Sequence, residues 1–159
     1  EKIIDLLTDF DFLEYQEEEN QNDYKISFYV NTKEENINKV KEQIKKNKIQ
    51  CNFIYSHSQF LDILPTRAGK GKAVKYLSNR WNFAPDSILT SGNSGNDEDL
   101  LQGKYLSVVV SNYSKELEKL KHKRRIYFAK SPYAAGIIEG INHFNFFNLK
   151  YEFNEQKNQ

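Results

Sequence analysis

Apolar and polar positions alternate in two different ways along the chain, and the change falls near residue 65. Before it, three short runs rich in β-branched and aromatic residues predict strands, over residues 24–30, 49–55 and 59–64. Apolar residues at helical spacing between the first two runs predict a helix that ends near residue 46. Residues 14–23 (EYQEEENQND) are polar and acidic, so we expect a loop there. This half predicts a small α+β unit.

After residue 65, predicted helices alternate with short apolar strands. The first helix spans residues 70–82, with Ala73, Val74, Leu77 and Trp81 on one side. Strands are expected over residues 87–91, 105–110 and 125–129, and helices over 97–102, 115–119 and 132–144. Strands and helices that alternate at this spacing predict a parallel sheet, and ligands bind such sheets at the carboxyl ends of the strands.

Composition narrows the class of protein. The chain has 159 residues, 38% of them hydrophobic and 14% aromatic, which excludes a polar disordered chain. With 23 Lys+Arg against 22 Asp+Glu, a general nucleic-acid binder is disfavoured, and we interpret the basic run 121–125 as a solvated loop. No stretch approaches the ~20 apolar residues of a membrane span. Cys51 has no internal disulfide partner, which fits a cytoplasmic protein.

One candidate site lies at residues 66–73 (TRAGKGKA), where Arg67, Lys70 and Lys72 gather at a helix start. The helix macrodipole favours negative charge at this position, so local stability alone does not explain three cations. A bound anion does, because exposed N–H groups, two glycines and a lysine can seat a phosphate. A solvated basic turn is the alternative. The segment is not a Walker A loop, since no Ser or Thr follows a Gly-Lys pair.

A second candidate site, residues 92–99 (GNSGNDED), directly follows the predicted strand 87–91. Short polar side chains at the carboxyl end of a parallel strand suit a hard cation such as Mg²⁺. An ordinary turn explains the same residues, with Asn96 or Asp97 as the N-cap and the following acids complementing the helix dipole.

Together, the two loops resemble the sucrose-phosphate phosphatase family of the haloacid dehalogenase-like superfamily. The matching motifs are Asp62-x-Leu64-Pro65-x-Arg67-x-x-Lys70-Gly71-x-Ala73 and Ile88-Leu89-x-x-Gly92-x-Ser94-Gly95-Asn96-Asp97, and residues 16–29 resemble the family's cap. The resemblance implies an α/β fold: a Rossmann-like core with an α+β cap. The core is partial, because the first catalytic strand with its Asp-x-Asp pair is missing. We expect a cap over residues 1–64, the second half of the core over 65–153 and a polar tail over 154–159.

The resemblance also implies roles for single residues. Lys70 matches the catalytic lysine that steadies the phosphoryl group, and Asn93 and Asp97 match metal positions for Mg²⁺. The family has Asp where this chain has Asn93, so one negative charge is lost and the resemblance implies weakened metal binding and hydrolysis. Five further positions are expected to contact the substrate: Gln16, Asn22, Lys25, Arg67 and Asn96.

Residues 131–144 (SPYAAGIIEGINHF) resemble phosphatase-type domains fused behind sucrose-phosphate synthases, whose sites are often eroded. We therefore predict the C-terminal part of a bacterial sucrose-phosphate synthase, whose glycosyltransferase domains join a nucleotide-sugar glucosyl group to fructose 6-phosphate in sucrose biosynthesis. The chain itself would be non-catalytic, would bind a sugar phosphate such as sucrose 6-phosphate and would dock against the N-terminal domains. Two alternatives stay open: a Mg²⁺-dependent sucrose-6-phosphate phosphatase, and an interaction domain without a ligand.

The chain begins with Glu1 and contains no methionine. With the motif order, this leads us to expect a piece of a longer protein that starts inside the cap. Half of a sheet leaves an exposed edge strand, so we also expect possible self-association through that edge.

Overall fold

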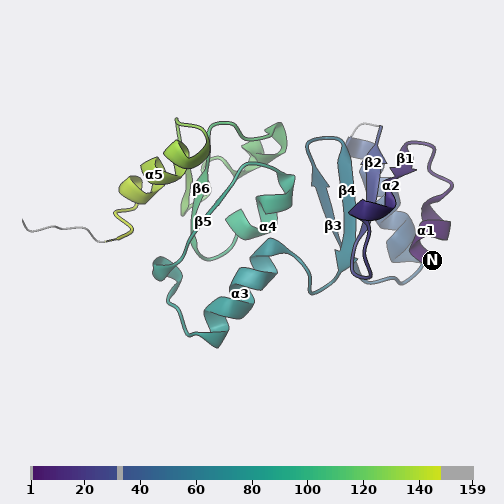
Figure 1. The fold of residues 1–159 in the computed structure, drawn as a ribbon, viewed down its shortest axis with the longest axis horizontal. Coiled ribbons are helices and arrows are strands. Elements are labelled where there is room, and N and C mark those ends of the chain that lie inside the picture. The colour runs from purple at the N-terminus through teal and green to yellow at the C-terminus, as the bar shows by residue number, and fades with distance from the viewer. Residues whose placement is uncertain (1, 32–33, 148–159) are drawn as a thin grey trace, which may run out of the picture.

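The computed structural model describes residues 2–31 and 34–147, and their strands form two separate sheets (Figure 1). The tail expected over residues 154–159 lies outside the described residues. In Figure 1 the antiparallel sheet and its helices lie at one end of the molecule and the parallel sheet at the other. None of the described helices combines the length and the apolar character needed to cross a membrane.

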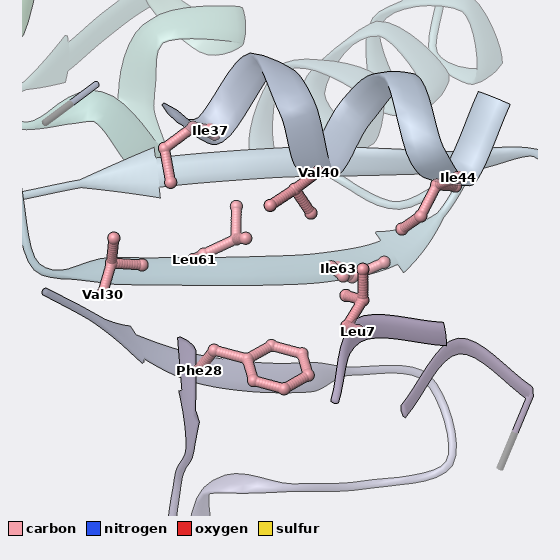
Figure 2. Close-up of a cluster of buried hydrophobic side chains, with 8 residues drawn as sticks. All are labelled: Leu7, Phe28, Val30, Ile37, Val40, Ile44, Leu61 and Ile63. Carbon is pink, nitrogen blue, oxygen red and sulfur yellow. The ribbon is translucent and has the colours of Figure 1, made fainter. Parts of the chain in front are cut away.

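The first sheet is antiparallel and has the order β1-β2-β4-β3. Its strands are β1 (Leu13–Tyr15), β2 (Ile26–Val30), β3 (Cys51–Ser56) and β4 (Phe60–Pro65), and two helices pack on one face, α1 (Lys2–Leu7) and α2 (Glu34–Lys46). Side chains alternate between the two faces of a strand, so every second residue of β2 and β4 meets the helices. Figure 2 shows the resulting core: Leu7, Phe28, Val30, Ile37, Val40, Ile44, Leu61 and Ile63.

The expected acidic loop over residues 14–23 is wrong at its start, because Glu14 and Tyr15 belong to β1. They pair with Tyr29 and Phe28 of β2. The pairing continues beyond the strand, where Gln16 N–H donates to the carbonyl of Ser27 at 3.0 Å. A three-residue edge strand carries too short a pattern to recognise alone, and its ladder with β2 decides its conformation.

The second sheet confirms the predicted parallel arrangement, with the strand order β5-β6-β7. Its strands are β5 (Leu89–Gly92), β6 (Leu106–Val109) and β7 (Ile126–Phe128), and its helices are α3 (Lys70–Arg80), α4 (Glu98–Leu101) and α5 (Tyr133–His143). Within the described residues, four short segments are 3₁₀ helices: η1 (Glu18–Asn20), η2 (Pro85–Ser87), η3 (Gly95–Asp97) and η4 (Lys115–Leu120). The helix expected over 115–119 is therefore a 3₁₀ segment.

The central strand β6 carries the core of this sheet, since Val108 and Val109 are both fully buried. Val109 packs with Leu101, Leu117 and Leu120. Val108 contacts α5, where a Cβ added to Gly140 would lie 2.2 Å from Cγ2 of Val108. Glycine is therefore required where α5 lies against the strand.

The apolar side expected on α3 is present but uncovered. Leu77 is 38% exposed and Trp81 57% exposed, and Trp81 makes an edge contact with the half-exposed ring of Phe83. In the described part of the chain, β5 pairs with β6 on one side and with no strand on the other. An apolar helix face and a strand edge are thus both left open by the residues that the structure describes.

The carboxylate of Glu139 fastens α5 to the end of β7. It accepts hydrogen bonds from the hydroxyl of Tyr127 at 2.5 Å and from the N–H groups of Lys130 and Ser131 at 2.9 and 3.0 Å. The Tyr127 hydroxyl, followed by these N–H groups, lowers the pKa of Glu139 from 4.5 to about 2.

We expect this carboxylate to stabilise the fold in a pH-dependent way. Its pKa is depressed in the folded state, so its contribution is complete above about pH 4.5 and is lost as the pH falls towards 2. Glu139→Gln should therefore lower the free energy of unfolding at pH 7, and the difference from the parent chain should shrink between pH 4.5 and 2. Urea titrations across this range measure it, with Glu42→Gln on the exposed side of α2 as the control. A difference that does not depend on pH would contradict the prediction.

Candidate functional site

The loop at residues 92–97 links β5 to α4 and is closed by one buried carboxylate. Asp97 is only 5% exposed, and its Oδ2 accepts the N–H groups of Asn93 at 2.9 Å and Ser94 at 3.3 Å. Ser94 and Asp97 form a reciprocal capping box around η3. Ser94 is thus the N-cap of η3, whereas Asp97, one of the two expected N-caps, is the N-cap of α4 and makes no side-chain capping bond there. Asp97, the third residue of η3, holds the loop through its side chain.

The second oxygen of this carboxylate joins the loop to the start of α3. Lys70 Nζ donates to Asp97 Oδ1 at 2.5 Å and to Asn96 Oδ1 at 3.0 Å. Ser94 Oγ also donates to Asn96 Oδ1 at 2.9 Å, which orients the amide. The Lys70 side chain is 51% exposed, whereas that of Asp97 is 8% exposed. A half-exposed cation is therefore held in place by a buried acid at the carboxyl end of β5.

Another acid, Asp99, balances the basic start of α3. Its Oδ2 accepts the N–H of Gly71 at 3.1 Å, which places negative charge where the helix macrodipole favours it. The predicted phosphate seat at this N–H is thus occupied by a carboxylate of the chain itself. Gly69 has a φ of +140°, and a Cβ there would lie 2.6 Å from the same Oδ2, so only glycine fits.

Both site loops lie against β3, the edge strand of the antiparallel sheet. Asn52 Nδ2 donates to the carbonyl of Ala68 at 3.0 Å, beside the Lys70 loop. On the other loop, a Cβ added to Gly95 would lie 2.1 Å from the carbonyl oxygen of Tyr55. The antiparallel sheet therefore touches the two segments that hold Lys70, Asn96 and Asp97.

A cavity of about 260 Å³ opens between β3 and α4. Its lining is mostly polar and includes Asn52, Glu98, Asp99 and Lys119. Asn96 is the one residue of the Lys70–Asn96–Asp97 group that lines it. The cavity thus adjoins the lysine site without enclosing it.

Comparison with known proteins identifies the family of this chain. The model of the sucrose-6F-phosphate phosphohydrolase family matches residues 1–145. The chain belongs to this family. Sucrose-phosphatase 1 of Nicotiana tabacum is 35% identical over 147 residues, which are 86% of this chain and 35% of the tobacco protein. Mannosylfructose-phosphate phosphatase of Agrobacterium fabrum is 30% identical over 146 residues, 90% of this chain and 59% of that protein.

A solved structure shows the same arrangement. The sucrose-phosphatase of Synechocystis, determined in complex with sucrose and phosphate, superimposes with a TM-score of 0.85 at 31% identity. The match covers 91% of this chain and 61% of that one. The α/β fold of the haloacid dehalogenase type, with a parallel core sheet and an antiparallel cap sheet, is therefore confirmed. The chain spans between about a third and three fifths of the length of these relatives.

The structure brings together three of the residues that the family resemblance singled out: Lys70, Asn96 and Asp97. Asn93 is half-buried beside them, and its carbonyl accepts the N–H of Ser114 at 2.7 Å. The amide oxygen of Asn93 and the carboxylate of Asp97 are the hard oxygen donors that Mg²⁺ prefers. They form an incomplete set, because no three Asp, Glu, His or Cys side chains gather as a metal site within residues 2–31 and 34–147.

The four remaining predicted substrate contacts lie elsewhere. Arg67 lines an open groove along α3 with Lys72 and Lys75. The other three gather at the β1–β2 connection of the cap, and no hydrogen bond or ion pair within the described residues joins them to the lysine site. Gln16 is buried, and its backbone carbonyl accepts a hydrogen bond from Nε2 of Gln21. Asn22 and Lys25 pair through an isolated antiparallel β-bridge. Lys25 also lines a groove beside Pro65. Their roles stay predictions.

Three residues organise the site in ways that the sequence analysis did not predict: Ser94, Asn52 and Asp99. The capping role of Ser94 could have been found, because Ser94-x-x-Asp97 has the spacing of a capping box. Asn52 and Asp99 carry no local signal, since each acts on a residue that lies 16 or 28 positions away.

We expect Asp97→Ala to destabilise the fold by about 1–3 kcal/mol, because two N–H donors at a buried turn lose their acceptor. Asp86→Ala, at an exposed carboxylate paired with Arg125, is the matched control and should cost at most about 1 kcal/mol. Urea unfolding of both variants at pH 7 measures the difference. Equal losses in the two variants would show that Asp97 does not hold the loop.

Proposed function

We propose that this chain supplies the cap, the catalytic lysine and part of the metal site of a phosphatase that acts on sucrose 6-phosphate. The observation that carries the proposal is the convergence of Lys70, Asn96 and Asp97 at the carboxyl end of β5, beside the cap. Membership of the sucrose-6F-phosphate phosphohydrolase family supports the substrate class. The relatives named above are phosphatases of sucrose phosphate or of mannosylfructose phosphate.

In this proposal Lys70 stabilises negative charge. Its ammonium group offsets the charge that develops on the phosphoryl oxygens, and a fixed donor stabilises a transition state better than one that must reorganise. Asp97 and Asn96 fix the position of the ammonium group through the two hydrogen bonds described above. Asn93 and Asp97 would hold Mg²⁺, which supplies Lewis-acid polarisation of the phosphoryl group when bound.

The attacking carboxylate must come from another segment, because within the described residues Asp97 is the one acid that pairs with Lys70. β5 has an unpaired edge in the described part of the chain. A strand added there in the parallel sense would end at the same edge of the sheet as the loop at residues 92–97. We propose that it carries the missing Asp-x-Asp pair, whose first Asp forms an aspartyl-phosphate that water then hydrolyses.

The synthase hypothesis is now the weaker one. The three relatives named above are phosphatases, so the alternative held at the level of sequence fits the comparisons better. Asn93 is the observation that still favours a chain without hydrolytic activity, because an amide contributes no negative charge to a cation site. The glycosyltransferase partner and the cytoplasmic location stay predictions.

The proposal predicts Lys70-dependent release of phosphate. In the complete product of the reading frame that encodes this chain, Lys70→Ala should lower kcat for sucrose 6-phosphate by about 10²–10³-fold, as expected for the loss of a charge-stabilising donor. Arg80→Ala, on an exposed position in the last turn of the same helix, is the matched control. Phosphate release is measured colorimetrically. Absence of release by the unsubstituted protein would favour the non-catalytic hypothesis.

The role of Asn93 is tested separately. We expect Asn93→Asp to lower the Mg²⁺ concentration needed for half-maximal phosphate release, because a carboxylate restores one negative charge to the site. Calorimetric titration of Mg²⁺ onto both forms provides a readout besides activity. An unchanged affinity would show that Asn93 does not face the cation.

A further inference from the structure

Glu116 lies in η4, outside the lysine site, and its half-buried carboxylate contacts two different parts of the chain. Its Oε1 accepts the N–H of His57 at 2.9 Å and the N–H of Gly95 at 3.1 Å. His57 begins the turn at residues 57–59, which joins the cap strands β3 and β4 and is called the cap turn below. Gly95 belongs to the loop at residues 92–97, called the site loop below. One oxygen atom thus connects the cap to the loop that holds Lys70.

Ser114, two residues earlier, repeats the connection. Its hydroxyl oxygen lies 3.1 Å from Nδ1 of His57, within hydrogen-bonding distance, and its N–H donates to the carbonyl of Asn93 at 2.7 Å. Four hydrogen bonds therefore run from the start of η4 to the cap turn and to the site loop, two to each. The two parts of the molecule share one anchoring segment.

The backbone of the cap turn has an unusual conformation that its contacts with η4 help to maintain. His57 and Ser58 both have positive φ angles, near +52° and +53°, and side chains other than glycine adopt these rarely. Conformations of this kind persist where surrounding contacts hold them, and Glu116 and Ser114 supply such contacts. Glu118, on the same 3₁₀ segment, offers a contrast, because it is exposed and its carboxylate pairs with Lys121 at 3.4 Å.

We propose that Glu116 is a positioning residue that couples the seating of the cap to the geometry of the site loop. Gly95 directly precedes Asn96 and Asp97, which hold Lys70. When the cap turn is in place, the shared carboxylate fixes both His57 and Gly95. Any displacement of the cap turn from η4 would remove one of the two donors of this carboxylate and part of the support of the site loop. The proposal rests on the proposed function for its kinetic consequence, but the connection itself is testable without catalysis.

Amide hydrogen exchange, followed by NMR on the complete protein, tests the connection. In Glu116→Ala the amides of His57 and Gly95 should both exchange at least about tenfold faster, because hydrogen bonds to a charged acceptor contribute about 1.5–3 kcal/mol each. The amides of Leu61 and Val109, inside the two sheets, should be unchanged. Glu118→Ala is the matched control and should alter none of them.

Glu116→Gln keeps an acceptor oxygen but removes the charge, so both amides should exchange at rates between those of the parent protein and Glu116→Ala. If Glu116→Ala does not fold, the glutamine variant decides alone. Faster exchange at both amides supports the coupling. Unchanged exchange, or faster exchange at His57 or Gly95 alone, overturns it.

Kinetics test the consequence for the site. Glu116→Ala should raise KM for sucrose 6-phosphate by about tenfold or more and lower kcat, and Glu116→Gln should restore most of the loss. A residue that only keeps the protein folded would lower the active fraction and leave KM unchanged, so an unchanged KM overturns the positioning role. If the parent protein releases no phosphate, the proposed function fails, and the exchange experiment still judges the connection.

Discussion

The carboxylate of Asp97 is the group on which the arrangement of the site depends. A buried charge is tolerated only when partners satisfy it, and here two backbone N–H groups and one ammonium group do so. Those same bonds fold the loop after β5 and hold Lys70, which comes from a helix 27 residues earlier in the chain. The requirement to satisfy one buried acid therefore fixes the position of a half-exposed cation.

The two sheets meet through edges and loops, and most of their buried apolar side chains belong to separate clusters, one for each sheet. The edge strand β3 of the cap lies against both site loops, through Asn52 on one and Tyr55 beside Gly95 on the other. An edge strand covered in this way is also protected from pairing with other chains. In the described residues β5 has an open edge instead, at the place where we propose that a further strand adds.

This construction makes the site sensitive to the contact between the cap and the core. Polar bonds between loops are individually weak, so several must act together to keep Lys70 in place. Glu116 and Ser114 contribute to this by binding the cap turn and the site loop at once. Asn93 changes the charge of the site without disturbing this framework, since its backbone groups make the bonds that hold the loop. The framework of the loop is thus compatible with an amide or a carboxylate at position 93, and the side chain there alters only the charge offered to a cation.

The fold class and three members of the site could be predicted before the structure was known. Periodicity is a local property, so the strand and helix patterns before and after residue 65 predicted both sheets. The family resemblance implied the roles of Lys70, Asn96 and Asp97. The sequence analysis missed β1, because Leu13–Tyr15 gains its conformation from a ladder with β2. It placed Asp99 in the loop at residues 92–99, but it did not predict that the Asp99 carboxylate accepts the N–H of Gly71, where we had expected an anion from outside. The contact between Asp99 and the start of α3, and the connection that Glu116 makes between the cap and the core, were visible only in the folded structure. Hydrogen bonds between distant segments depend on where the folded backbone places those segments. They produce no periodic pattern in the sequence.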